Sequence, residues 1–391
     1  MNLMFSDKTK MFGAGIFAVL NEKKLQLQEQ GKTIYNLSVG TPDFRTPQHI
    51  MDAVTEAAKK PENYRYSLTD LPELTLAVQD FYQRRFGVAL EKEEIMSMNG
   101  SQEGMAHFAW TLCDPGDIVL VPDPGYPIFS IGPQLCDAAA VEYPLYEENH
   151  FLPRFEDIPE ETARAARFMV VNYPSNPVCS VADDSFYEEL IAFAKKYEIV
   201  ILHDNAYSDI VFGGKEGGSF LQYEGAKEVG VEFYSLSKSF NYTGARMSFC
   251  VGNAEIISRF RAVRSQIDYG VFYPVQYGAI AALTGPFDGV REQCREYEER
   301  SRTLCSGLRS IGWDVKDTDG TMFVWAPLPE GFDNANAFCM ELMERSGVIC
   351  TPGSSFGRLG EGYVRFALVL PPEKLKEAVE SIRISGIIRK G

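Results

Sequence analysis

The sequence is poor in the residues that bind metal ions. It has four histidines among 391 residues, and no two of them stand at the spacing of metal ligands. The eight cysteines are scattered and form no Cys-x-x-Cys pair. Most lie in apolar stretches, as is typical of small core residues in a reducing compartment. We therefore expect no metal site.

Long apolar runs and an excess of positive charge are also missing. No stretch approaches the length of a membrane span, and the N-terminal residues lack the apolar run of a signal peptide. The net charge of −16 and the isoelectric point near 4.9 disfavour nucleic acids and anionic membranes as partners. These features predict a soluble cytoplasmic protein, and they leave room for an anionic ligand in a local basic pocket.

What is present is the pattern of a large α/β protein. The length and the 45% hydrophobic content allow a large core and predict two or three domains. Uniformly apolar strands separated by helices predict a parallel sheet that is covered on both faces. The expected strands are 95–99, 118–124, 139–145, 167–174, 199–207 and 231–237.

Two domains follow from this pattern. We predict a three-layer α/β/α domain with a mostly parallel sheet over residues 45–287. Residues 1–44 and 288–391 would form a smaller α+β domain, which includes a helix at 14–30 and a strand at 313–316.

One lysine stands where an apolar strand ends. Lys238 follows the strand at 231–236, with serines on both sides and Arg246 after a turn. A single lysine of this kind is most often a solvated loop residue. A dry setting and a neighbouring cation would instead lower the pKa of its amine and make it a nucleophile. We take Lys238 as the candidate nucleophile.

Three other strands end in polar residues. In open parallel sheets, ligands bind beyond the carboxyl ends of the strands. Ser101 and Gln102 open a helix that could bind a phosphate, although serine and glycine also cap helices without any ligand. Asn176 lies in a turn, and asparagine before proline is usually only a turn residue. Asp204 follows a buried run and should call for a cationic partner.

Together these groups suit pyridoxal 5′-phosphate. The lysine would form a Schiff base with its aldehyde, and the carboxylate would keep the pyridine nitrogen protonated, so that the ring accepts electrons. At ~3 Å and an effective dielectric constant of about 20, that ion pair is worth on the order of 5 kcal/mol before desolvation. The tyrosine at 207 could donate a hydrogen bond to the phenolate oxygen of the ring.

At these residues the chain resembles the class I/II aminotransferases, which are fold type I pyridoxal-phosphate enzymes. The most specific part is SLSKSFNYTGAR at 235–246, in which the arginine comes eight residues after the lysine. The resemblance implies that Lys238 forms the Schiff base and moves the substrate proton, and that Asp204 pairs with the pyridinium. It also implies further cofactor-binding residues: Tyr207 and Asn176 at the ring oxygen, Tyr126 on the ring, and Ser101, Gln102, Ser235, Ser237 and Arg246 at the phosphate.

The resemblance also implies a substrate site and a partner. Arg365 matches the arginine that binds the substrate carboxylate, for which a bidentate guanidinium is well suited, assisted by Asn176 and the Gly40 backbone. Tyr66 matches a tyrosine that reaches the phosphate of the neighbouring subunit. The expected assembly is therefore a homodimer with shared active sites.

Within the family, the chain is most similar to the group of alanine (glutamate–pyruvate) and LL-diaminopimelate aminotransferases. It differs at three places: Val178-Cys179 replaces a Thr-Gly turn, Gln102 a lysine, and Ala245 a tryptophan. We predict an aminotransferase that exchanges an amino group between an L-amino acid, such as alanine or glutamate, and a 2-oxo acid. Two alternatives stay open: a carbon–sulfur β-lyase on the same fold, and a non-catalytic cofactor-binding regulatory module.

Overall fold

The computed structural model describes residues 1, 3–11 and 16–388. The chain divides into two compact units. The larger comprises residues 41–298 and 319–321, and the smaller comprises 1–40, 299–318 and 322–391. Each unit is described by itself below.

The larger unit is built on a seven-stranded sheet with the order β2-β8-β7-β6-β5-β3-β4. Only β8 among these strands runs antiparallel to its neighbours, β2 and β7. The strands are β2 (Ile95–Met98), β3 (Ile118–Asp123), β4 (Ala139–Pro144), β5 (Ala166–Asn172), β6 (Val200–Asn205), β7 (Gly230–Ser235) and β8 (Ser248–Gly252). All except β8 therefore end at the same edge of the sheet.

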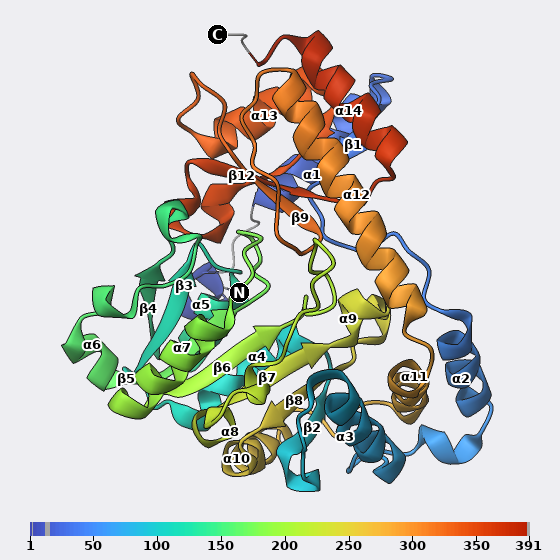
Figure 1. Ribbon diagram of the computed structural model, residues 1–391, viewed down its shortest axis with the longest axis vertical. Helices are drawn as coiled ribbons and strands as arrows, with labels where there is room; N and C mark the ends of the chain where they lie inside the picture. The colour runs from blue at the N-terminus through green and yellow to red at the C-terminus, as the bar shows by residue number, and fades with distance from the viewer. Residues whose placement is uncertain (2, 12–15, 389–391) are drawn as a thin grey trace. The chain divides into compact units, whose positions relative to one another are not determined.

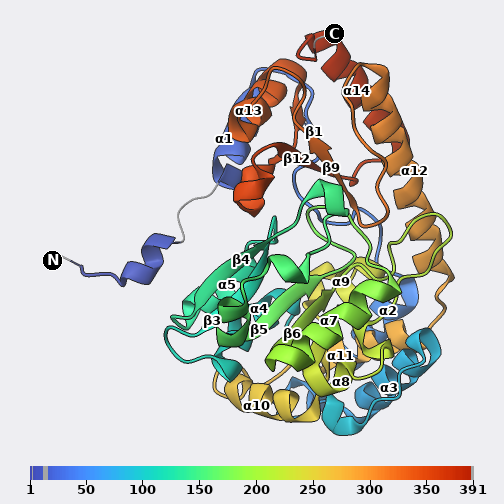
Figure 2. The ribbon, with the colours of Figure 1, turned by 60° about the vertical axis from the view of Figure 1, so that its left-hand side comes forward.

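Helices cover both faces of this sheet, as the two ribbon views show (Figure 1, Figure 2). One face packs on α4 (Ser101–Leu112), α5 (Ile128–Leu135) and α10 (Ala254–Arg264). The other contributes to a core with α2 (Gln48–Ala58), α3 (Pro72–Phe86), α7 (Asp184–Tyr197), α8 (Ala226–Val229) and α11 (Tyr273–Thr284). Two short helices, α6 (Glu160–Ala165) and α9 (Leu236–Ser239), precede and follow strands of the sheet.

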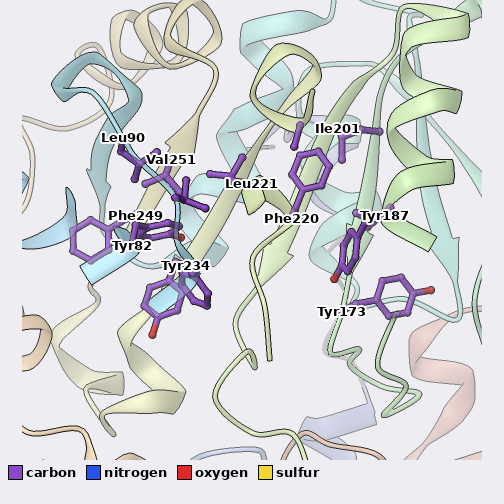
Figure 3. Packing of buried hydrophobic residues seen from close by; sticks show 14 of the residues in the cluster. Tyr82, Leu90, Tyr173, Tyr187, Ile201, Phe220, Leu221, Tyr234, Phe249 and Val251 are labelled. Atoms are coloured by element: carbon purple, nitrogen blue, oxygen red, sulfur yellow. The ribbon is translucent and has the colours of Figure 1, made fainter. Parts of the chain in front are cut away.

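Successive side chains along each strand point to opposite faces of the sheet, so the core is divided into two layers. In β6, Ile201 faces the α7 side and Leu202 faces the α4 side. The larger cluster contains many aromatic side chains, among them Tyr82 and Tyr234, whose rings cross at 78° with centroids 6.0 Å apart (Figure 3). A strand that is apolar on both sides needs cover on both sides, which explains the three layers.

The smaller unit contains two short sheets. β9 (Phe323–Pro327), β11 (Thr351–Pro352) and β12 (Tyr363–Ala367) form an antiparallel sheet, and β1 (Tyr35–Asn36) pairs in parallel with β10 (Val348–Ile349). Its helices are α1 (Ile16–Glu29), α13 (Ala335–Ser346), α14 (Pro372–Ser385) and the part of α12 (Asp288–Ser310) from residue 299 onward.

The prediction of a three-layer α/β/α unit with a mostly parallel sheet is confirmed. β8 was not predicted from the sequence, and the strand expected at 313–316 is not formed. Residues 14 and 15 of the helix expected at 14–30 lie outside the described residues, and α1 covers Ile16–Glu29. In the described part of the chain, no helix has the length and apolar character needed to cross a membrane.

Candidate active site

Several of the predicted site residues follow strands that end at the carboxyl edge of the large sheet. Asn172 of β5 is in register with Asp204 of β6, which is in register with Phe233 of β7. The segments that follow these strands carry Asn176, Tyr207 and Lys238. β2 ends at the same edge, because β8 is antiparallel to both β2 and β7. Separate stretches of sequence are thus brought to one edge by strand pairing.

Asp204 is a buried acid with a shifted pKa at this edge. Its side chain lies on the α4 side of β6 and is 8% exposed. Burial raises the pKa of the carboxyl group to about 7, an effect that nearby Glu232 adds to and His203 opposes. Oδ1 has no hydrogen-bond partner among the described residues. A buried carboxylate oxygen in this state calls for a cationic donor from a ligand.

Asn172 holds the surroundings of Asp204 in place. Its Nδ2 donates to the backbone oxygen of Asp204 at 2.8 Å, and its Oδ1 accepts from the backbone N–H of Asn176 at 2.8 Å. Asn176 is itself buried. Asn172 lies within the strand expected at 167–174 and was given no role, because its contact with Asp204 depends on strand pairing.

Lys238 lies in a single helical turn directly after β7. This turn, α9, is capped by Ser235, whose Oγ accepts from the backbone N–H of Ser237 at 3.2 Å. Lys238 is partly buried, and its carbonyl oxygen accepts from Nε2 of Gln293 at 2.8 Å. The expected strand at 231–237 thus ends two residues earlier, at Ser235. The lysine is fixed by a helix turn rather than carried on a loose loop.

A second group of residues surrounds the start of α4. Gly100 precedes the helix with φ +90°, and a Cβ placed on it would lie 2.2 Å from Nη2 of Arg246. The Arg246 guanidinium therefore occupies the space beside the helix N-terminus, where it also donates to the oxygen of Thr243 at 3.0 Å. Oγ of Ser101 is buried and makes no hydrogen bond within the described part of the chain. A helix N-terminus, a hydroxyl and a guanidinium lie together here, and such a cradle could hold a phosphate.

Tyr126 and Tyr207 lie on the segments after β3 and β6. The Tyr126 hydroxyl donates to Oε1 of Gln102 at 3.1 Å, so this tyrosine is tied to the first turn of α4. Tyr207 is buried in the turn that follows Asp204. Tyr66, by contrast, is 74% exposed, and its ring centroid lies 5.0 Å from that of Tyr269.

Arg365 and Gly40 belong to the smaller unit and lie close to one another there. The Arg365 guanidinium lies 4.1 Å from the ring centroid of Phe323 and 4.5 Å from that of Phe356. Its Nη2 donates to the oxygen of Ser38 at 3.3 Å. Gly40 approaches the same Phe323 ring, since a Cβ there would be 2.6 Å from the ring atoms. Aromatic faces on a buried guanidinium hold it in one orientation, which suits a planar carboxylate ligand.

Comparisons with known proteins show the family to which the chain belongs. The family model described as aminotransferase class I and II matches residues 32–382. The chain belongs to this family. It is 44% identical over 370 residues to an LL-diaminopimelate aminotransferase of Moorella thermoacetica, covering 94% of this chain and 95% of that protein.

Solved structures of related enzymes agree with this assignment. Substrate-bound BacF from Bacillus subtilis superposes with a TM-score of 0.94 at 36% identity, over 98% of both chains. A probable N-succinyldiaminopimelate aminotransferase from Thermus thermophilus superposes with a TM-score of 0.90 at 35% identity, over 95% of this chain and 100% of that one. The predictions of a fold type I aminotransferase and of its cofactor, pyridoxal 5′-phosphate, are confirmed.

The residues of this aminotransferase fit the cofactor chemically. The unpartnered oxygen of Asp204 suits a pyridinium N–H, and the cradle at Ser101 and Arg246 suits a phosphate. The regulatory-module and β-lyase alternatives receive no support from the relatives, which are named as aminotransferases.

Proposed function

We propose that this aminotransferase moves an amino group from an L-amino acid to 2-oxoglutarate or pyruvate, with Lys238 and Asp204 at the centre of its site. The observation that carries the assignment of roles is the buried carboxylate oxygen of Asp204, which no described residue satisfies. The cofactor supplies an electron-accepting ring that stabilises negative charge at the substrate α-carbon. Asp204 keeps that ring protonated.

Lys238 is proposed as the group that moves the proton. Its amine would hold the cofactor covalently in the resting enzyme and, when free, would move the proton between the substrate α-carbon and the cofactor carbon that carried the aldehyde. The capped turn α9 fixes the backbone that carries this amine. Tyr207 and Asn176 are proposed to donate to the ring oxygen, and Tyr126 to stack on the ring.

The remaining predicted residues are proposed to orient cofactor and substrate. Ser101, Gln102, Ser235, Ser237 and Arg246 would bind the phosphate, and Arg365 with the Gly40 backbone would bind the substrate carboxylate. Because the relatives carry the name LL-diaminopimelate aminotransferase, that amino acid is the first donor to test. Gln102, Val178, Cys179 and Ala245 are the positions at which this chain departs from the pattern expected of that group.

The functional test combines a donor panel with a choice of acceptors. Alanine, glutamate and LL-diaminopimelate are supplied with pyruvate or 2-oxoglutarate, and both products are quantified. We expect one new amino acid and one new oxo acid in equal amounts. A β-lyase would instead release pyruvate and a thiol from cystathionine without any oxo-acid acceptor, and that outcome would overturn the proposal.

We also propose a homodimer with shared active sites. Large apolar side chains are exposed together on two segments of the larger unit: Tyr64, Tyr66, Leu68, Ile267, Tyr269 and Phe272. The ring centroids of Tyr64 and Phe272 lie 5.4 Å apart, so the two segments form one surface. Exposed aromatic surface of this kind is typical of protein interfaces. A second copy of the chain is the proposed occupant, with Tyr66 reaching its phosphate site.

Subunit mixing tests this arrangement. Lys238→Ala and Tyr66→Ala chains are each prepared separately and then mixed under conditions that exchange subunits. If Tyr66 serves the neighbouring subunit, a mixed dimer regains one complete site and activity rises above that of either parent. Activity that stays at the average of the two parents would show that the sites are not shared.

We further infer a cytoplasmic location. None of the eight cysteines, all of which lie in the described part of the chain, forms a disulfide, and five of them are buried. Free thiols are typical of reducing compartments. Cell fractionation with antibody detection tests this inference, and recovery outside the cytoplasm would contradict it.

A further inference from the structure

The turn that carries Lys238 is held by two buried side chains that the chemistry above does not use. One is Asp209, which is 7% exposed and lies in the segment after β6. The other is Gln293, also 7% exposed, in the first turns of α12. Both belong to the larger unit. Each of the two side chains makes a hydrogen bond to a residue of this turn.

Asp209 connects the residues on either side of the lysine. Its Oδ2 accepts from the hydroxyl of Tyr234 at 2.7 Å and from Oγ of Ser239 at 2.5 Å. Tyr234 belongs to β7 and lies four residues before Lys238, whereas Ser239 is the residue directly after Lys238. Burial raises the pKa of the Tyr234 hydroxyl well above its ordinary value, so this group stays protonated and donates. One carboxylate oxygen thus joins the strand to the turn.

The other oxygen of Asp209 faces a cation. Oδ1 lies 3.4 Å from Nη2 of Arg85, and the same guanidinium pairs through Nη1 with Glu216 at 3.1 Å. A buried carboxylate requires such compensation. Asp209 is therefore anchored on α3 as well as on the lysine turn.

Gln293 acts on the carbonyl side of the turn. Its Nε2 donates to the oxygen of Lys238 at 2.8 Å, while its Oε1 accepts from Nδ2 of Asn241 at 2.6 Å. Asn241 has φ +53°, the left-handed conformation that ends the turn. The amide of Gln293 thus spans the lysine and the residue that reverses the chain three positions later.

We propose that Asp209 and Gln293 are positioning residues for Lys238, which fix the turn from two sides so that the amine meets the aldehyde and the substrate α-carbon. The inference rests on the proposed role of Lys238. Small errors in such placement are costly, since a displacement of about 1 Å can slow a reaction by about a hundredfold. Gln293 contacts the backbone of the turn, and Asp209 contacts the hydroxyls of Tyr234 and Ser239.

The experiment separates placement of the lysine from binding of the cofactor. Cofactor-free enzyme is mixed with pyridoxal phosphate, and the visible band is followed as Lys238 Nζ forms its C=N bond to the aldehyde carbon and water leaves. Pyridoxamine phosphate has no aldehyde, so its dissociation constant reports on the rest of the site. For Asp209→Ala and Gln293→Ala we expect bond formation to slow by at least about tenfold, with the pyridoxamine phosphate constant within about twofold of wild type.

Three variants complete the design. Asp209→Asn keeps one oxygen that can accept from both hydroxyls, so we expect it to restore most of the rate. Ser239→Ala removes only the hydrogen bond between the turn and Asp209, and it should also slow formation of the C=N bond. This variant tests the proposal if Asp209→Ala does not fold. Asp80→Ala removes an exposed carboxylate from α3 and should leave both quantities unchanged.

Two results would overturn the proposal. One is a rate of bond formation within about twofold of wild type in folded Gln293→Ala and Ser239→Ala. The other is a parallel loss of pyridoxamine phosphate affinity and of thermal stability, which would assign these residues to the general fold. Neither result touches the aminotransferase activity itself, because that is measured separately with the donor panel.

Discussion

Asn172 and Asp204 face each other across the parallel strands β5 and β6, and the amide of Asn172 donates to the Asp204 carbonyl at 2.8 Å. The same asparagine accepts from the backbone of Asn176. The backbone around the acid is therefore satisfied by a neighbour, whereas its carboxylate Oδ1 is not satisfied within the described residues. This contrast between a fixed backbone and an unsatisfied carboxylate oxygen defines the site.

The first prediction concerns the stability of the cofactor-free enzyme. The Asp204 pKa is raised from 3.8 to about 7 in the folded protein, so the native state binds more protons than the unfolded state between these values. Stability must fall as pH rises through this window. At about 1.4 kcal/mol for each pKa unit, the loss amounts to roughly 4 kcal/mol above pH 7. Asp204→Asn cannot ionise, so we expect it not to show this loss of stability.

Urea unfolding of the cofactor-free proteins from pH 5 to pH 8 measures this difference. As pH rises, we expect the free energy of unfolding of Asp204→Asn to increase relative to that of wild type. The free energy of unfolding of Asp80→Asn should change with pH as that of wild type does. With the cofactor bound, we expect Asp204→Asn to be less active than wild type, because the amide cannot pair with a pyridinium. A constant difference between Asp204→Asn and wild type over this range would count against the raised pKa.

The second prediction concerns the buried carboxylate of Glu232, on the opposite face of the sheet. It is fully buried and accepts from the hydroxyls of Tyr82 and Ser219, both at 2.8 Å, and His203 Nδ1 lies 3.0 Å from it. Glu232→Ala leaves these partners without their acceptor. The expected loss is about 3–5 kcal/mol of unfolding free energy.

Chemical denaturation measures that loss. Glu188→Ala, on the exposed face of α7, is the matched control and should change stability by less than about 0.5 kcal/mol. Glu232→Gln retains an acceptor and should lie between the two. A Glu232→Ala protein as stable as the control would show that the cluster contributes little.

The third prediction tests the phosphate cradle. Gly100→Ala places a methyl group where the Arg246 guanidinium lies, at a backbone φ of +90° that disfavours alanine. Arg246 must move, and we expect the dissociation constant of the cofactor to rise by at least about tenfold, which corresponds to about 1.4 kcal/mol. Gly289→Ala, whose Cβ meets open space, is the control. Equal affinities in the two variants would argue against a phosphate at this position.

The fourth prediction concerns substrate recognition in the smaller unit. Arg365→Lys keeps the charge but loses the planar fork and its packing between Phe323 and Phe356. We expect KM for the amino donor to rise by roughly ten- to a hundredfold, as for the loss of a charge-assisted hydrogen bond. The spectrum of the bound cofactor should stay that of wild type. Arg358→Lys, an exposed neighbour, should leave KM unaltered.

The sequence carried enough information for the layers of the fold and for the strand ends. Local signals such as the apolar run before Asp204 and the serines around Lys238 are visible in one stretch of chain. The antiparallel strand β8 was missed, because its direction is set by pairing with β2 and β7 rather than by its own residues. A short apolar run gives no sign of its orientation.

The supporting residues were missed for the same physical reason. Asn172, Asp209 and Gln293 resemble ordinary turn or helix residues in sequence. Their contacts join segments that lie between 30 and 55 residues apart, as in Asn172 with the Asp204 carbonyl, Asp209 with Ser239, and Gln293 with Lys238. Such contacts exist only after the sheet has formed, so no local pattern predicts them.

The most direct test of the central assignment is chemical trapping of the lysine. The enzyme with its cofactor bound is reduced with borohydride, digested and mapped by mass spectrometry. We expect the phosphopyridoxyl group on Lys238, and no labelled peptide from Lys238→Ala treated in the same way. Labelling of a different lysine in the wild-type enzyme would contradict the account.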